Sequence, residues 1–592
     1  MFDALRRIGE AVLQAGGVVE PAPLAGKGRY LVKVIFDLDS GALDCGYMEC
    51  RSESEDGRLV DNVEVLRRVM WVGNRKGNVA AWSITTNVLQ YLLNPQKGKR
   101  WAIGSLKKLA EEAGEEELAS LLRDVCRRFF GEKGSSEGST EGSLRDLTED
   151  FLRIMKLDAG DVALYTVAVR RGGREVMLAD TPSYRRMVLG DLKVPKRDLV
   201  SGVCHACGGR GLVLADPAYP PGSLLKVYNV DKKSFMHGAG KDSLSRAITH
   251  AVCPECSFKL RVGLSYVERY FTVRLLGLKV HLIPSMFGAT VQDLEVLRYS
   301  VPKAFAVTSR PRGAVDFWSD VQLFNAMKLN CFIHIVFTRS TGKSNVDVVG
   351  EICEASLPRL VEVGRLMSET VEEAGLPNVD IGFEAVGRVF PLRCTGGDVD
   401  WEPYLRLIEA IISGSRYDAG ELARMAVLYA RIQRGLAGGY TVKPGGDVYD
   451  GLLKYVLLQR FMAKLGCIRM SGAKFGTKLG GFLERQGYEE WQAALFLLGY
   501  VAAKADEAFA GSGRPAYGRI NMAGMSVEDV KLFAVTVAKD MVYRGVMDRC
   551  AEEYAAAKAL LDRNLPRLTN PIDNVFYILS GYAYAIGGEG NE

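Results

Sequence analysis

The sequence predicts an α+β fold: a large mixed α/β N-terminal part with an inserted four-cysteine zinc module, followed by a C-terminal helical bundle. Three observations predict this fold. Segments rich in β-branched and aromatic residues recur through the N-terminal part. From about Glu402 this strand signal fades and helical periodicity dominates to the end of the chain. Two Cys-x-x-Cys pairs lie between the strand-like segments.

The composition is that of an ordinary globular protein. The chain has 592 residues, of which 48% are hydrophobic and 25% charged, and its mean hydropathy is +0.01. The apolar content excludes intrinsic disorder, and the lack of repeats excludes collagen-like and mucin-like classes. The longest apolar stretch, Trp491 to Ala503, is shorter than the ~20 residues of a membrane-spanning helix, and the N-terminus has no signal-peptide pattern. We therefore expect a cytoplasmic protein that does not contact a membrane.

The first elements follow from local patterns. Apolar residues at helical spacing predict a helix over residues 2–15, and β-branched and aromatic residues predict a strand over 30–36. Residues 105–130 are predicted to be helical. They lead into a Gly/Ser/Glu-rich segment, for which we expect a flexible loop at 131–145. A Gly172-Gly173 pair between two strand-like runs predicts a β-hairpin.

The later elements complete the predicted organisation. A Ser526-x-x-Asp529 pattern predicts the start of a helix within the C-terminal bundle. Strands are predicted at 162–170, 174–178, 271–283, 331–338 and 346–349. Four parts are expected: an N-terminal α/β domain at 1–200, a zinc module at 201–262, a continuation of the α/β part at 263–413, and the helical bundle at 414–592.

Four of the 12 cysteines predict a metal site. Cys204, Cys207, Cys253 and Cys256 form two Cys-x-x-Cys pairs separated by 45 residues. Two intervening residues allow both thiolates of a turn to face one ion, and four thiolates suit one structural, tetrahedral Zn²⁺. A disulfide is disfavoured in a cytosolic protein, and the alternative is four unrelated cysteines. The other eight cysteines are interpreted as ordinary buried thiols.

Three of the five histidines lie in the same part of the sequence as the cysteine pairs. They are His205, His237 and His250. Because a closed structural site needs four ligands and four cysteines supply them, these histidines are interpreted as bystanders rather than ligands.

Two long windows contain basic residues and no acidic ones, although the net charge of the whole chain is only +5. The first, from Val65 to Ala110, has nine Lys and Arg residues with interleaved tryptophans; the second runs from Gly451 to Leu483. Basic side chains attract phosphate backbones, and aromatic rings stack on unpaired bases. The windows therefore predict nucleic-acid binding, with a solvated basic face as the alternative. The predicted contacts are Arg67, Arg68, Asn74, Arg75, Lys76, Asn78, Lys97, Lys99, Arg100, Lys454, Arg460, Lys464, Arg469, Lys474 and Lys478.

Familiar catalytic motifs are incomplete in this sequence. Thr341-Gly342-Lys343-Ser344 ends like a phosphate-binding loop, but a phenylalanine occupies the first glycine position, so a turn is the better interpretation. Gly396-Gly397-Asp398-Val399 and Gly445-Gly446-Asp447-Val448 resemble half of a polymerase turn, and both lack its second aspartate. We therefore expect a binding protein rather than an enzyme.

The cysteine window resembles the large subunit of type I CRISPR surveillance complexes (Cascade), type I-B branch. The similarity covers roughly residues 200–285. It is carried by the two cysteine pairs, by Tyr228-Asn229-Val230-Asp231-Lys232-Lys233-Ser234-Phe235 between them, and by Gly277-Leu278-Lys279-Val280-His281-Leu282-Ile283-Pro284 after them. Elsewhere only the order and size of the parts agree.

The resemblance implies a non-catalytic subunit of a crRNA-guided antiviral complex, in contact with its backbone subunits. Such a subunit reads the protospacer-adjacent motif in duplex DNA, aids strand opening, holds the displaced strand and recruits a helicase–nuclease. It also implies motif reading or strand wedging near Asn74 to Asn78, or near Lys232, Lys233 and Phe235. Two alternatives remain: a zinc-containing enzyme acting on nucleic acid (a nuclease or RNA-modifying enzyme), and the polymerase-like large subunit of a type III effector.

Overall fold

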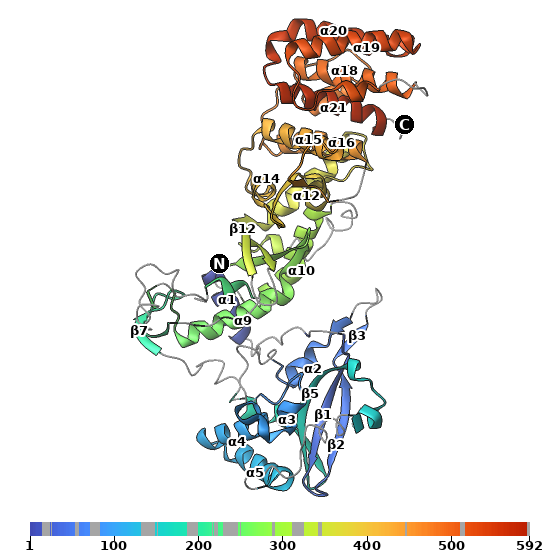
Figure 1. The fold of residues 1–592 in the computed structure, drawn as a ribbon. Helices are drawn as coiled ribbons and strands as arrows, with labels where there is room; N and C mark the ends of the chain where they lie inside the picture. The colour runs from blue at the N-terminus through green and yellow to red at the C-terminus, as the bar shows by residue number, and fades with distance from the viewer. Residues whose placement is uncertain are drawn as a thin grey trace. The chain divides into compact units, whose positions relative to one another are not determined.

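The computed structural model describes most of the chain. The described residues are 1–14, 24, 27–53, 59–71, 83–131, 149–150, 152–185, 187, 199–215, 217, 219, 223–228, 247–248, 250–286, 290–310, 325–340, 346–443, 447–508 and 515–588. They form two compact units, which we call the N-terminal unit (1–270, 287–294 and 340–347) and the C-terminal unit (271–286, 295–339 and 348–592). We describe each unit by itself (Figure 1).

The N-terminal unit contains a four-stranded sheet in the order β2-β1-β5-β6. The central strands β1 (Tyr30–Asp37) and β5 (Val162–Arg171) are parallel, and the outer strands β2 (Leu43–Glu49) and β6 (Arg174–Met177) pair antiparallel with them. The other elements of this unit are α1 (Phe2–Gln14), β3 (Arg51–Glu53), β4 (Leu59–Asp61), α2 (Val63–Arg68), α3 (Gln90–Leu93), η1 (Pro95–Arg100), α4 (Ala102–Glu112), α5 (Glu116–Phe130), η2 (Ala159–Asp161), η3 (Leu178–Asp180), β7 (Leu199–Val203), β8 (Arg210–Leu214), η4 (Leu224–Tyr228) and α9 (Pro254–Tyr270).

The side chains of β1 are buried on both faces of the sheet. Val32, Val34 and Phe36 belong to a core cluster with α4 and α5, which Figure 1 shows on one side of the sheet. Leu31 and Ile35 belong to a smaller cluster on the opposite face. Burial on both faces explains why β1 is a continuous apolar run rather than an alternating one.

Helix α1 packs on α9 through two glycines. A Cβ at Gly9 would lie 1.9 Å from the Lys259 carbonyl oxygen, and one at Gly263 would lie 1.9 Å from the Leu5 carbonyl oxygen. The helix backbones therefore meet directly, and Lys259 adds an ion pair to Glu10 (2.9 Å). The N-terminal helix thus supports the helix that carries the second cysteine pair.

The C-terminal unit begins with a second four-stranded sheet, in the order β12-β11-β10-β9. Its strands are β9 (Thr272–Leu275), β10 (Leu278–Ser285), β11 (Phe332–Ser340) and β12 (Val346–Ser356). A small sheet of β13 (Leu392–Thr395), β14 (Asp398–Val399) and β15 (Tyr440–Thr441) follows.

Helices make up most of the C-terminal unit after β12. Figure 1 shows α18 to α21 stacked together near the C-terminus. Helix α10 (Val291–Ser309) precedes β11, and the later helices are α12 (Leu357–Glu373), α13 (Phe383–Val389), α14 (Glu402–Ser413), α15 (Ala419–Gln433), α16 (Val448–Lys464), α17 (Gly480–Gln486), α18 (Glu490–Glu507), η7 (Ala516–Arg519), α19 (Val527–Tyr543), α20 (Met547–Asn564), η8 (Leu565–Arg567) and α21 (Pro571–Gly587).

The predicted α+β class with a C-terminal helical region is confirmed. The Gly172-Gly173 hairpin forms, with both glycines at positive φ (58° and 71°). The Ser526 and Asp529 side chains form the capping box that begins α19. None of the helices in the described part of the chain combines the length and apolarity needed to cross a bilayer.

Two predicted elements are wrong in their extent. Residues 105–130 form two helices instead of one, because Gly114 adopts a left-handed conformation (φ 71°) between α4 and α5. Residues 271–283 form parts of two strands, because Leu276 and Gly277 turn the chain at positive φ (52° and 93°). The predicted flexible loop at 131–145 and the predicted turn at Thr341 to Ser344 lie outside the described residues, apart from Gly131.

A four-cysteine candidate metal centre

The predicted cysteine quartet comes together in the N-terminal unit. Cys204 and Cys207 lie in the turn that joins β7 to β8, and Cys253 and Cys256 lie at the start of α9. The four Sγ atoms all lie within 4.8 Å of one another. Two chain segments that are far apart in sequence therefore present one cluster of sulfur ligands.

Backbone hydrogen bonds hold the two segments in place. The Gly208 N–H donates to the Cys204 carbonyl oxygen (2.8 Å), and Gly208 takes the left-handed conformation (φ 74°) that this tight turn requires. The second segment joins the first where the His205 N–H donates to the Ala251 carbonyl oxygen (2.8 Å). Leu214 and Val252 form an antiparallel bridge beside this contact. The geometry of the quartet is therefore set by main-chain contacts.

The quartet is partly buried. The Cys204 and Cys256 side chains are buried, Cys253 is half-buried, and Cys207 is exposed. The Cys256 N–H lies 3.4 Å from the Cys253 Sγ and donates to it. Four sulfur donors with backbone N–H support form a donor set that could hold a metal ion.

The acidity of the thiols supports this interpretation. Burial raises the pKa of the Cys204 thiol, but hydrogen bonds from the backbone N–H groups of Cys253 and Cys207 outweigh burial and lower that pKa to about 7. Burial and the neighbouring sulfur atoms raise the pKa of the Cys256 thiol far above its ordinary value. The neighbouring sulfur atoms therefore disfavour a second thiolate at Cys256 without a cation, and a bound cation would stabilise all four thiolates together.

His205 and His250 lie beside the quartet and outside its ligand set. The His250 Nε2 is hydrogen-bonded to the Tyr219 hydroxyl (2.8 Å), and burial followed by the charge of His205 lowers the pKa of His250 to about 4. The His205 ring packs near His250, with ring centroids 6.1 Å apart. His237 lies outside the described residues. The interpretation of His205 and His250 as bystanders agrees with this geometry.

The first basic window is only partly described. Arg67 and Arg68 are exposed at the end of α2, and Arg68 forms an ion pair with Asp180 (2.8 Å). Lys97 is half-buried in η1, which also contains Lys99 and Arg100. The remaining predicted contacts of the N-terminal half lie outside the described residues: Asn74, Arg75, Lys76, Asn78, Lys232, Lys233 and Phe235.

The second basic window divides into two groups of side chains. Lys454 pairs with Asp450, and Lys464 pairs with Glu373 (2.7 Å), so both charges are compensated by acids from outside the window. Arg460 is half-buried in α16. Arg469, Lys474 and Lys478 are exposed on the segment between α16 and α17. The exposed positive charge of this window is therefore concentrated on one connecting segment.

That connecting segment is held against the helices that follow it. The Phe475 N–H donates to the Glu484 carboxylate (2.9 Å), and the Ser471 hydroxyl donates to the Glu489 carboxylate (2.8 Å). The Ala473 N–H donates to the Tyr488 carbonyl oxygen (2.9 Å). Glu484 and Glu489, which follow the window in the sequence, thus hold the segment in place, and its basic side chains stay exposed.

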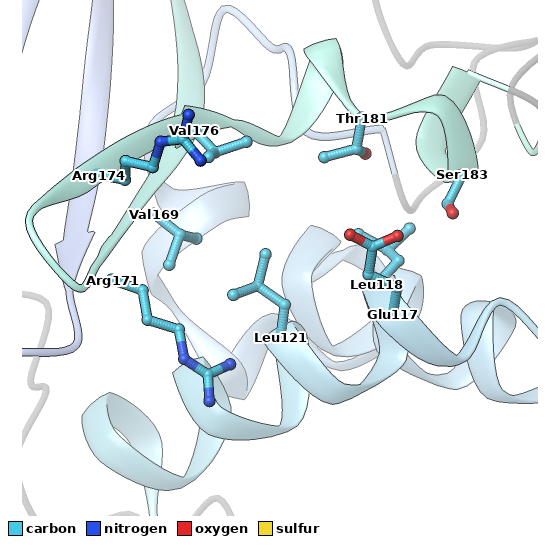
Figure 2. A pocket seen from close by; sticks show the side chains of 9 residues that line it. All are labelled: Glu117, Leu118, Leu121, Val169, Arg171, Arg174, Val176, Thr181 and Ser183. Atoms are coloured by element: carbon cyan, nitrogen blue, oxygen red, sulfur yellow. The ribbon is translucent and has the colours of Figure 1, made fainter.

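A small pocket in the N-terminal unit was not predicted from the sequence (Figure 2). It has a volume of about 270 Å³ and lies between α5 and the β5–β6 hairpin. Leu118, Leu121 and Val169 supply apolar walls, and Arg171 and Arg174 lie near its rim. Its lining comes from two segments, residues 117–121 and 169–183, that are far apart in the sequence. No local sequence motif therefore predicts the pocket.

A second group of possible metal ligands also escaped sequence reasoning. His334, Glu351 and Cys353 of the C-terminal unit present ligand atoms within 4.8 Å of one another.

Cys353 is exposed, and Cys45 and Cys394 are half-buried, so the interpretation of all eight remaining cysteines as buried thiols is wrong. It holds for Cys50, Cys126, Cys331, Cys467 and Cys550.

Comparison with known proteins gives two matches to family models. Residues 201–314 match the central domain of the CRISPR-associated protein TM1802. Residues 381–589 match the C-terminal domain of the same family. The first match contains the whole cysteine quartet, and the second contains α14 to α21; together they cover more than half of the chain. No curated protein matches the chain.

Proposed function

Because this chain belongs to the CRISPR-associated TM1802 family, we propose that it is a non-catalytic, DNA-binding large subunit of a crRNA-guided type I effector complex. In this role it recognises the protospacer-adjacent motif in duplex DNA, aids strand opening and recruits the helicase–nuclease. The observation that carries the proposal is the match of both the cysteine-containing central domain and the C-terminal helical domain to one CRISPR-associated family.

The cysteine quartet holds a structural Zn²⁺ in this proposal. An all-sulfur donor set favours Zn²⁺ over hard cations such as Mg²⁺, and four protein ligands leave no position for a substrate. The ion would join the β7–β8 turn to the start of α9. Its binding free energy would therefore contribute to the folding of the segment between the two cysteine pairs.

The exposed segment between α16 and α17 supports DNA binding by the C-terminal unit. Arg469, Lys474 and Lys478 are exposed on it, while Lys454 and Lys464 are neutralised by carboxylates. Positive side chains that are free of carboxylate partners are the ones that gain from releasing counterions of a phosphate backbone. We assign contact with the separated strands to these three residues. Motif reading is assigned to residues 74–78 or 232–235.

The proposal of a non-catalytic chain draws support from one candidate motif. Gly396 and Gly397 form the turn between β13 and β14, with positive φ of 60° and 90°. Asp398 follows with a largely exposed side chain, paired with Arg339 at 3.2 Å. A tight hairpin turn explains this sequence without a metal-binding polymerase site, which would need a second aspartate.

Reconstitution of the complex tests the proposal. The chain would be co-expressed with the products of its neighbouring CRISPR genes and a crRNA, and the complex purified through a tag on another subunit. The expected result is co-purification of this chain with the crRNA. A duplex library with a randomised sequence beside the target should be enriched for one short motif, and omission of the chain should abolish that enrichment.

Two results would contradict the proposal. One is a complex that selects the same motif and binds target duplex equally well without this chain. The other is cleavage of DNA by the purified chain alone in Mg²⁺ or Mn²⁺, which would favour an enzyme. A catalytically competent helicase–nuclease added to the complex serves as the positive control for cleavage.

A further inference from the structure

The C-terminal unit places a histidine, a glutamate and a cysteine together on the sheet β12-β11-β10-β9. His334 lies on β11, and Glu351 and Cys353 lie on the neighbouring strand β12. One ring nitrogen of His334, one carboxylate oxygen of Glu351 and the Cys353 Sγ all lie within 4.8 Å of one another. All three residues belong to the C-terminal unit, so the group does not involve the cysteine quartet.

The strand geometry explains why these three side chains meet. Glu351 and Cys353 are two residues apart on β12, so they project from the same face, and the intervening Ile352 is buried on the other face. Glu354 then adopts a left-handed conformation (φ 58°), and Cys353 and Glu354 are both exposed. This interruption of the alternation is typical of a β-bulge and lies directly after the candidate ligands, within β12.

One ring nitrogen of the histidine, Nδ1, has no hydrogen-bond partner among the described residues. This nitrogen is buried. A buried imidazole nitrogen without a partner costs free energy, and a metal ion or a ligand bound to the ion would remove that cost. Glu351 and Cys353 are exposed, so both side chains are free to rotate toward an ion.

The distances suit a small transition-metal ion. With metal–ligand bonds of 2.0–2.3 Å, donor atoms in a tetrahedral zinc site lie about 3.3–3.8 Å apart. The present donor separations are at most 4.8 Å, so the donor atoms would have to approach one another by no more than about 1.5 Å. Rotation of the side chains can supply this distance. A thiolate with an imidazole selects zinc-like ions over Mg²⁺ or Ca²⁺, which prefer oxygen ligands.

We propose that His334, Glu351 and Cys353 form a second, exchangeable site for a divalent zinc-class ion. The site differs from the quartet in two respects. It has three protein ligands instead of four, which leaves one position for water or for a ligand from outside the chain. Two of its ligands are exposed, so the ion exchanges with solution more readily than one held by the largely buried quartet.

Metal counting on the full-length chain tests this site. The protein is dialysed against excess Zn²⁺, freed of unbound metal, and its zinc content measured per chain. The wild-type chain should hold two equivalents, and one of them should be removed by mild chelation. His334→Ala and Cys353→Ser should each hold one equivalent, which resists the chelator. With Zn²⁺ left in the quartet after mild chelation, Co²⁺ added to the emptied second site should give a thiolate-to-cobalt absorption band, and this added band should be missing in Cys353→Ser.

A matched variant and two outcomes make the test decisive. Glu354→Gln removes a neighbouring exposed carboxylate outside the ligand group, and it should retain both equivalents. If His334→Ala misfolds, Cys353→Ser still decides the question, because an exposed side chain contributes little to the core. The proposal is overturned if the wild-type chain holds one equivalent in excess zinc, or if Cys353→Ser and His334→Ala both retain two.

Discussion

Gly499 of α18 and Gly581 of α21 bring two helices of the C-terminal unit into direct backbone contact. A Cβ at Gly581 would lie 1.8 Å from the Phe496 carbonyl oxygen, and a Cβ at Gly499 would lie 1.9 Å from the Ile578 carbonyl oxygen. Neither distance can be relieved by rotating a side chain, because the opposing atoms belong to the backbone. The helices must therefore separate if either position gains a side chain.

We expect Gly581→Ala to lower the free energy of unfolding of the C-terminal bundle by more than about 2 kcal/mol, because a methyl group overpacks a closed contact. In a helix without such a contact, alanine would instead be favoured over glycine by about 1 kcal/mol. A loss of stability would therefore show that the close contact outweighs helix propensity. Hydrogen exchange of α18 and α21 peptides in the full chain measures the change. Gly481→Ala in α17 is the control: its Cβ would meet only the Arg485 side-chain tip at 3.3 Å, so unchanged or increased protection is expected.

Local sequence patterns correctly predicted features that depend on residues close together in the sequence, such as the start of a helix or a metal-binding turn. Ser526 and Asp529 predicted the start of α19 because a capping box needs only residues three apart. The cysteine pairs predicted a cluster because both halves of the ligand set carry their own turn. The same local reasoning missed the break at Gly114, since a lone glycine is tolerated in helices. Here the glycine is left-handed and belongs to a local cap, in which the Gly114 and Glu115 N–H groups donate to the Glu111 and Ala110 carbonyl oxygens.

Properties that depend on distant residues could not be predicted in this way. The acid-free window from Gly451 to Leu483 suggested six available charges, yet Glu373 lies 91 residues from the Lys464 that it neutralises. The group of His334, Glu351 and Cys353 has no motif spacing either, because it depends on the pairing of β11 with β12. Sequence periodicity predicts which side chains of a strand share a face, but it does not predict which other strand pairs with that strand.

The buried ion pair between Asp506 and Arg544 predicts a second stability effect. The Arg544 side chain is 3% exposed and that of Asp506 is 9% exposed. Asp506 also accepts hydrogen bonds from the Tyr582 hydroxyl (2.8 Å) and from the Ala516 N–H (2.8 Å). Asp506→Asn removes the near partner of Arg544 and leaves that buried guanidinium with a longer ion pair to Asp540 (3.7 Å). We therefore expect a loss of about 3 kcal/mol of unfolding free energy, at the lower end of the cost of breaking a buried ion pair.

Chemical denaturation of the full chain, with hydrogen exchange to assign the transition to α18 and α19, measures the effect of Asp506→Asn. The control is Asp562→Asn in α20, where the pair with Lys558 is exposed and should contribute less than about 0.5 kcal/mol. Equal effects of the two substitutions would contradict the importance assigned to burial.

Loss of the quartet's metal should unfold only the segment that it joins. We expect Cys256→Ser to release the tightly held zinc, because a buried thiolate ligand is replaced by a hydroxyl that binds zinc poorly. Limited proteolysis should then cut between residues 204 and 256 while α18 to α21 stay protected. Cys394→Ser, which removes a half-buried thiol outside the quartet, should leave zinc content and proteolysis unchanged. A fully folded, metal-free wild-type chain would contradict the structural role.

The exposed basic segment predicts a change in the salt dependence of DNA binding. Replacing Arg469, Lys474 and Lys478 by alanine should weaken binding to target DNA, and each lost phosphate contact should flatten the slope of log K against log salt by about 0.9. The assembled complex is titrated with target DNA at several salt concentrations. Lys454→Ala with Lys464→Ala is the matched control, because both lysines are already paired with carboxylates and should leave the slope unchanged. A larger effect of the control than of the triple variant would show that DNA lies on a different face of the helices.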